Sequence, residues 1–169
     1  FSVTQDGNIR FGLNAIKGVG SSAVEMIIRE REEHGPFENV YDFFERVPMS
    51  IVNKKTLESL IFSGAFDSFG LQREIYSAPM ETGNDDSFLS ALVRFGQVSQ
   101  AEQSLNESSL FGGDDEALQI PRPTPPTHFV ELSDMERLNK ERELVGLYLS
   151  GNPLDPYRVL LECYCPVNA

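Results

Sequence analysis

Two glycines enclose one apolar residue in Gly18-Val19-Gly20, and a helical pattern begins immediately after them. Glycine allows the backbone to reverse sharply, while Val19 can hold the turn against a core. In such a turn the backbone N–H groups at the start of the next helix, those of Ser21 and Ser22, point outward. These donors and the positive end of the helix dipole suit a phosphate group. The spacing therefore predicts a phosphate-binding turn.

The order apolar, Lys17, Gly, apolar, Gly and then Ala23 is that of a helix-hairpin-helix motif. Residues 37–66 repeat the plan of helix, turn and helix, and the turn from Ser50 to Lys55 lacks the paired glycines. Two such units side by side can straddle a minor groove and hold both backbones. A corner between helices that binds no ligand, with lysines that are merely solvated, remains the alternative. The candidate DNA-binding residues are Lys17, Gly18, Val19, Gly20, Ser21, Ser22, Asn53, Lys54 and Lys55.

Local signals predict the elements that would position these turns. Asp6-Gly7 is a hairpin turn, so residues 1–11 should form a small β-hairpin. Gly35-Pro36 should end a helix over 21–34, because Pro cannot continue it. An aromatic helix should follow over 37–47, and Asn53 should cap a helix from Lys54 to about Ser63. The sequence predicts a mainly α fold in which this hairpin and tandem unit precede further helices and a Pro-rich linker.

The second half of the chain has three predicted segments. Phe88 begins an amphipathic helix that should extend to about Gln103 and pack on the tandem unit. Residues 104–127, rich in Ser, acidic residues and Pro, have the composition of a flexible linker. Ser133 and Glu136 form a capping box for a helix to about Ser150. Its predicted apolar stripe is Met135, Leu138, Val145 and Tyr148, and a last helix after Asp155-Pro156 should bury Tyr157, Val159, Leu160 and Leu161.

These patterns predict four regions. Residues 1–75 should form the hairpin and tandem DNA-binding unit, and 76–103 the packing helix. Residues 104–127 should be the linker with a docking peptide, and 128–169 a helical segment that leads to a further domain.

Two adjacent bulky apolar residues, Leu110 and Phe111, stand within this polar linker and precede two glycines. Such a pair in flexible surroundings is typical of a short peptide that enters a pocket on a partner protein. Packing of both side chains onto the chain's own core is the equally weighted alternative. The candidate docking peptide is Glu107, Ser108, Ser109, Leu110 and Phe111.

The net charge of −12 argues against a general nucleic-acid-binding surface, but the charge is unevenly spread. Residues 1–75 have 8 Lys and Arg against 11 Asp and Glu, and residues 76–169 have 6 against 15. Any DNA contact should therefore lie in the first half. The apolar runs are too short to span a membrane and no signal peptide precedes them, which predicts a soluble, cytoplasmic protein. Phe1 in place of Met indicates a piece of a longer chain.

The Cys, His and Asp residues of this sequence do not form the patterns of a metal site or a catalytic site. Cys163 and Cys165 lie too close to bridge each other, and His34 and His128 stand apart from other ligands in the sequence. A pair of Asp residues that could hold two magnesium ions for phosphoryl transfer is also missing. We expect no metal, no cofactor and no catalytic residue in this chain.

A series of motifs in one order resembles the bacterial DNA polymerase III alpha subunit family. The resemblance covers nearly the whole chain, apart from about 76–103 and 114–130. Glu107 stands where the family's clamp motif usually has Gln, and Asn152 where it often has His. The matching residues are Ile9–Leu13, Ile16–Gly20, Gly35–Phe37, Asp42-Phe43, Val52–Lys54, Leu57–Ile61, Gly64–Asp67, Ser109–Gly112 and Glu143–Asp155.

The resemblance implies a region between the polymerase fingers and an oligonucleotide-binding domain. Lys17 to Ser22 would contact one DNA strand of the new duplex, and Ser50 to Lys55 the other. Glu107 to Phe111 would dock on the sliding clamp. The catalytic carboxylates would lie upstream of Phe1, so the magnesium ions would belong to the parent polymerase. Further partners would be other subunits of the bacterial replicative holoenzyme, in the cytoplasm and without a membrane.

Two other function classes remain open from the residues alone. In a scaffold module the hairpins would only pack against neighbouring domains. In a DNA-repair nuclease fragment, paired hairpins would bind DNA, but Leu110 and Phe111 would have no role.

Overall fold

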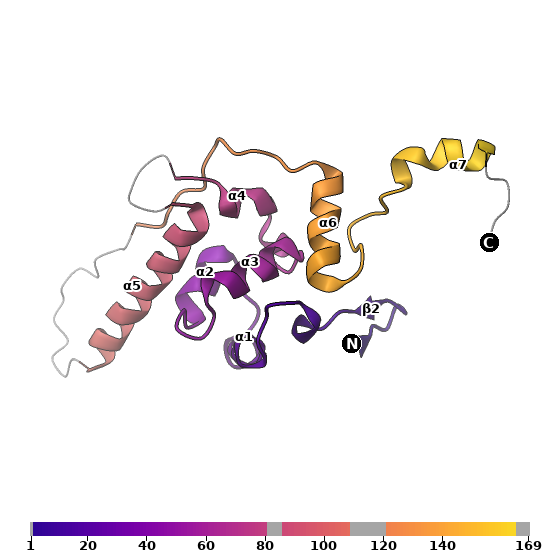
Figure 1. Cartoon of the computed structure of the whole chain (residues 1–169). Coiled ribbons are helices and arrows are strands. Elements are labelled where there is room, and N and C mark those ends of the chain that lie inside the picture. The colour runs from indigo at the N-terminus through magenta and orange to yellow at the C-terminus, as the bar shows by residue number, and fades with distance from the viewer. Residues whose placement is uncertain (1, 81–85, 109–120, 165–169) are drawn as a thin grey trace.

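The computed structural model describes residues 2–80, 86–108 and 121–164, and the fold is mainly helical (Figure 1). A two-stranded hairpin comes first in the chain and the following helices form the body, with the hairpin and the C-terminal helix both at the right of that body in Figure 1. The elements are β1 (Ser2–Val3), β2 (Ile9–Arg10), η1 (Leu13–Ala15), α1 (Ser21–His34), α2 (Val40–Arg46), α3 (Lys54–Phe62), η2 (Asp67–Phe69), α4 (Arg73–Ser77), α5 (Phe88–Ser108), α6 (Asp134–Val145), η3 (Asp155–Tyr157) and α7 (Arg158–Tyr164).

The β-hairpin that the Asp6-Gly7 turn predicts is confirmed. Strands β1 and β2 pair antiparallel, with Val3 opposite Ile9, and Gly7 has a φ of 80°. Both of these apolar side chains are 73% exposed. The hairpin therefore contributes little to the core of the body.

The local stop and start signals place α1 and α3 correctly. Gly35, with a φ of 84°, ends α1 after His34. The side chain of Asn53 accepts a hydrogen bond from the Thr56 amide and begins α3, which ends one residue before Ser63. The predicted start of the aromatic helix at residue 37 was wrong. Because the Asn39 side chain accepts from the Asp42 amide, α2 begins at Val40.

The core lies where α2, α3 and α5 pack, and it is rich in aromatic rings. Phe43 makes edge-to-face contacts with the rings of Phe37 and Phe66, at centroid distances of 5.0 and 4.9 Å. Its largest fully buried side chains include Tyr76, Phe44, Phe88, Leu57, Leu60, Ile61, Leu92, Val47 and Val52.

Helix α5 is fastened to the end of α2. The side-chain amide of Gln100 donates to the carbonyls of Phe44 and Val47, at 3.0 and 2.8 Å, and so satisfies groups at the C-terminus of α2. Gly96 lies against the Phe44 carbonyl, where a Cβ would collide. The predicted packing of this helix on the tandem unit is confirmed. The helix extends to Ser108, five residues beyond its predicted end.

Part of the predicted linker contacts the body. The Tyr41 hydroxyl on α2 donates to the Pro123 carbonyl at 2.8 Å, and the Arg122 guanidinium lies over the Tyr41 ring. Arg122 also pairs with Glu45 at 3.3 Å. Residues 121–126, which we name the Pro strap, therefore lie against α2. The four-region division itself stays a prediction.

Helix α6 is shorter than predicted. The capping box of Ser133 and Glu136 is confirmed, but the helix ends at Val145 because Gly146 takes a left-handed φ of 87°. Tyr148 consequently lies outside the helix. Of the predicted apolar stripe, Leu138 is buried and Met135 is 49% exposed.

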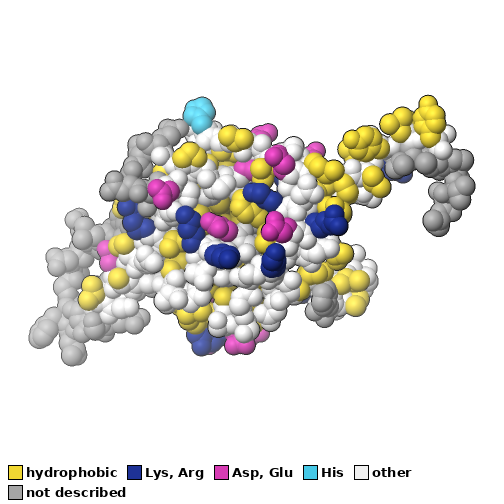
Figure 2. Space-filling model, viewed as in Figure 1, with side chains coloured by type: hydrophobic (Ala, Val, Ile, Leu, Met, Phe, Trp, Pro, Cys, Tyr) yellow, Lys and Arg dark blue, Asp and Glu magenta, His cyan; other side chains and the backbone are white. Residues whose placement is uncertain are grey.

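The last helix was predicted to bury its apolar residues, and that was wrong for Tyr157, Val159 and Leu160, which are exposed. The side chain of Leu161 lies outside the described residues. Helix α7 extends away from the body (Figure 1), and its apolar side chains face solvent in Figure 2. Local periodicity identified an apolar face but not whether the rest of this chain covers it. In the part of the chain that the structure describes, no helix is long and apolar enough to cross a bilayer.

Candidate nucleic-acid interface

The first turn has the geometry that its glycines predict. Gly18 has a φ of 85°, a conformation that favours glycine, and the Val19 amide donates to the Ile16 carbonyl at 3.2 Å. Gly20 is the N-cap of α1 and offers no capping side chain. The first three N–H groups of a helix have no partner within it, and here Ser21 and Ser22 are exposed. The N-terminus of α1 is thus open to an acceptor from outside.

The second turn is held more tightly. The Ile51 and Val52 amides donate to the Pro48 carbonyl, at 3.0 and 3.2 Å, and Val52 is fully buried. At the N-terminus of α3, Asn53 already accepts from the Thr56 amide at 2.9 Å. The N-terminus of α1 therefore leaves more backbone donors free than that of α3, where one donor is capped.

Side-chain contacts bring the two turns together. The Thr56 hydroxyl, in the first turn of α3, donates to the Gly18 carbonyl at 3.3 Å. A hollow of about 640 Å³ lies between the start of α1 and the second turn. Its lining residues are Ser22, Glu25, Met26, Arg29, Ser50 and Ile51.

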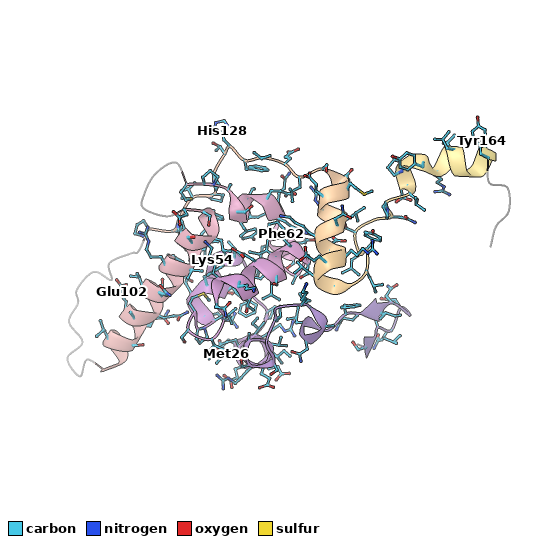
Figure 3. The ribbon with its side chains drawn as sticks, viewed as in Figure 1. Met26, Lys54, Phe62, Glu102, His128 and Tyr164 are labelled. Atoms are coloured by element: carbon cyan, nitrogen blue, oxygen red, sulfur yellow. The ribbon has the colours of Figure 1, made fainter. Side chains whose placement is uncertain are left out.

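The three predicted lysines differ in their surroundings. Lys17 is exposed, and its Nζ lies 3.9 Å from Glu143 of α6. Lys54, near the middle of Figure 3, donates to the Ser90 hydroxyl of α5 at 2.8 Å, and Lys55 is exposed. Figure 2 shows Lys and Arg side chains across the middle of this face, with Asp and Glu between them. The face therefore has mixed charge, and its basic groups are not one continuous patch.

The candidate docking peptide is described by the structure only in its first two residues. Glu107 and Ser108 belong to the last turn of that helix. Ser109, Leu110 and Phe111 lie outside the described residues. Their assignment to clamp docking stays a prediction.

A buried ionic network joins α6 to α4, and the sequence analysis did not predict it. Glu141 of α6 is fully buried and pairs with Arg73 of α4 at 2.7 Å. The same carboxylate accepts from the Leu149 and Ser150 amides, both at 2.9 Å, and Arg73 also pairs with Asp67. Burial alone would raise the pKa of Glu141, but the hydrogen bonds from the Ser150 amide, Arg73 and the Leu149 amide lower it. The network fixes α6 and the segment after it to the tandem unit.

The signal that could have indicated this network is the spacing of Glu141 from Leu138. The two residues are three positions apart, so they share one face of α6, and Leu138 was predicted to be buried. A carboxylate on a buried face needs a partner, and Arg73 lies in a segment whose helix, α4, was not predicted.

His34, which the sequence analysis left without ligand neighbours, lies close to two carboxylates in the structure. Glu30, Glu33 and His34 each bring a ligand atom within 4.8 Å of the others. The Nε of Arg46 lies 3.8 Å from Glu30 and the ring of His34 lies 3.2 Å from it. Glu30 is thus the residue of this cluster that contacts both His34 and Arg46.

Comparisons with known proteins agree with this geometry. A family model described as a helix-hairpin-helix motif matches residues 1–76. The chain is 36% identical over 168 residues to a DNA polymerase III subunit alpha from Borreliella burgdorferi, covering 99% of this chain and 14% of that protein. It is 38% identical over 154 residues to the subunit from Deinococcus radiodurans, covering 91% and 11%. For Pseudomonas aeruginosa the identity is 37% over 164 residues, covering 93% and 14%.

The match extends over almost all of this chain but over a small part of each relative. The chain spans between 11% and 14% of the length of these three subunits. It corresponds to a region of the bacterial DNA polymerase III alpha subunit that contains a helix-hairpin-helix motif.

Proposed function

We propose that this region holds the backbone of duplex DNA, without sequence preference, through its two hairpin turns. The observation that carries the proposal is the open N-terminus of α1, which the Thr56–Gly18 hydrogen bond keeps beside the N-terminus of α3. Backbone N–H donors at helix starts bind phosphate oxygens and carry no sequence information. Lys17 and Lys55 would add exposed positive charge near the two turns.

The other half of the proposed function is attachment to the sliding clamp through Glu107 to Phe111. Weak backbone contacts alone give a short-lived, salt-sensitive complex. A second attachment raises the effective concentration of DNA and prevents loss of the primer end. Nucleotide transfer, with its magnesium ions, would be performed elsewhere in the parent polymerase, and the other holoenzyme subunits would be further partners in the bacterial cytoplasm.

Substitutions of Gly20 distinguish DNA binding from a scaffold role. Gly20 has a φ of −80° and is exposed, so other residues fit there without strain. Gly18→Ala would instead force alanine into a positive φ and place its Cβ 3.0 Å from the Ser59 hydroxyl. A loss of DNA binding in that variant could then come from a damaged fold. Gly20→Asp and Gly20→Asn both offer a good N-cap, and only Asp adds a negative charge.

We expect Gly20→Asp to be at least as stable as the wild type and to bind duplex DNA about tenfold more weakly than Gly20→Asn. Fluorescence anisotropy with labelled duplex measures the affinities, and urea unfolding measures the stabilities. Equal affinities for the two variants would favour the scaffold module.

Clamp attachment has a separate test. Phe111→Ala should weaken binding to a sliding clamp about tenfold, or about 1.4 kcal/mol, by removing an apolar anchor. Surface plasmon resonance with immobilised clamp gives the affinity, and duplex binding should not change. An unchanged clamp affinity would contradict the docking assignment and would favour the DNA-repair alternative.

A further inference from the structure

The last turn of α6 lies against the first hairpin turn. The Lys17 amide donates to the Leu144 carbonyl at 2.8 Å, although 127 positions separate the two residues in the chain. Leu144 is half-buried against the same core as Leu13 and Val19. Figure 1 shows this end of α6 next to the segment between β2 and α1. Helix α6 therefore forms one wall of the proposed DNA site.

This wall presents negative charge to the site. A helix C-terminus has a partial negative charge, and the Leu144 carbonyl that contacts Lys17 is part of it. The Glu143 carboxylate lies 3.9 Å from the Lys17 ammonium, and both side chains are 72% exposed. The nearby basic side chains of α6 interact elsewhere, because Lys140 lies over the Phe62 ring and Arg142 over the Tyr148 ring. Glu143 is thus the α6 side chain that pairs with Lys17.

The wall cannot simply move away when DNA approaches. Glu141, two residues before Glu143, is held by Arg73 and by the Leu149 and Ser150 amides. The left-handed Gly146 ends the helix directly after this turn. Because the backbone at Glu143 is fixed, its exposed carboxylate stays within reach of Lys17 and phosphate must compete with it.

We propose that Glu143 sets the DNA affinity of the first hairpin by competing with phosphate for Lys17. The proposal rests on the proposed function, that this hairpin binds a DNA backbone. An exposed ion pair is weak, so the competition lowers affinity without preventing binding. Such a contact lets the duplex move through the site while the second attachment retains it.

Charge changes at Glu143 in the 169-residue chain test the proposal. Glu143→Gln should bind duplex DNA about two- to fivefold more tightly at low salt, a range set by the weakness of exposed ion pairs. Glu143→Lys should bind more tightly still, and the slope of log affinity against log salt should steepen by about one. Fluorescence anisotropy at several salt concentrations measures both quantities.

Two controls separate a local effect from a general one. Glu102→Gln removes the same charge on α5, at the other end of the body in Figure 3, and should change affinity less than Glu143→Gln. In a Lys17→Ala background, Glu143→Gln should lose most of its effect. Equal gains at Glu102 and Glu143, or an undiminished gain without Lys17, would overturn the proposal.

The outcomes also distinguish this proposal from the proposed function. If Lys17→Ala weakens duplex binding and Glu143→Gln has no effect, the hairpin binds DNA and the competition is wrong. If the wild type and all variants fail to bind duplex, the proposed function is contradicted and this proposal with it.

Discussion

The hydroxyl of Thr56 donates a hydrogen bond to the backbone carbonyl of Gly18 across 38 positions of sequence. Thr56 is buried in the first turn of α3, and Gly18 stands in the first hairpin turn at a φ of 85°. The bond therefore joins the start of the second hairpin's helix to the turn of the first. A duplex that contacts both turns depends on this relationship, because its two phosphate backbones lie a fixed distance apart across the groove.

Replacement of Thr56 tests the link between the hairpins. Thr56→Val keeps the shape and leaves the Gly18 carbonyl without its donor, so the free energy of unfolding should fall by about 1 kcal/mol. Duplex affinity should fall as well, because the two turns lose their alignment. Urea unfolding and anisotropy measure the two effects. Thr56→Ser keeps the hydroxyl and is the matched control, and equal DNA binding by both variants would contradict the link.

The close approach of α5 to α2 predicts a strong effect at Gly96. A Cβ there would collide with the Phe44 carbonyl, so Gly96→Ala should destabilise the fold by about 1–3 kcal/mol, although Ala is the better helix former. Gly151→Ala is the matched control, since its Cβ would meet only Leu138 at 3.8 Å. Thermal unfolding of both variants gives the comparison. A stabilised Gly96→Ala would show that the helices can separate at little cost.

The buried Glu141 predicts a pH dependence of stability. Its hydrogen bonds outweigh burial and hold its pKa below the usual value, so its contribution is present above the unfolded pKa of about 4.5 and is lost as pH falls through the folded pKa. Glu141→Gln removes the charge that accepts from Arg73 and from two amides, while Asp67 still pairs with Arg73, so stability should fall by about 1.5–3 kcal/mol near neutral pH. The difference between variant and wild type should shrink on acidification, which urea unfolding over a pH series measures. A difference that does not change with pH would contradict the ion-pair account.

The Pro strap provides another prediction. Tyr41→Phe removes the hydrogen bond to Pro123 and keeps the ring under Arg122. We expect the free energy of unfolding, measured by urea unfolding, to fall by about 1 kcal/mol. Tyr148→Phe is the matched control, because an arginine also lies over the Tyr148 ring but the Tyr148 hydroxyl accepts from Arg142 and is not bonded to the strap. Equal stabilities of wild type and Tyr41→Phe would show that other contacts hold the strap.

Sequence alone placed the elements whose boundaries depend on local chemistry. Gly35-Pro36 gave the end of α1, Asn53 gave the start of α3, and Ser133 with Glu136 gave the start of α6. Each of these signals depends on residues a few positions apart, so it can be recognised in the sequence.

Contacts between distant residues could not be predicted in this way. Tyr41 and Pro123 are 82 positions apart, and Arg73 and Glu141 are 68 apart. The residues also do not reveal that Lys17 has a carboxylate neighbour from α6, since that contact depends on the packing of α6. The hairpin turn was therefore predictable, but the charge that surrounds it was not.

The most direct test of the account measures duplex and single-stranded DNA binding by the wild-type chain as a function of salt. If the open N-terminus of α1 and the second turn hold two phosphate backbones, duplex should bind more tightly than single strands. Its log affinity should fall linearly with log salt, by about 0.9 for each phosphate contact. Weak binding to both substrates, unaffected by salt, would contradict the account and leave the hairpins with a purely structural role.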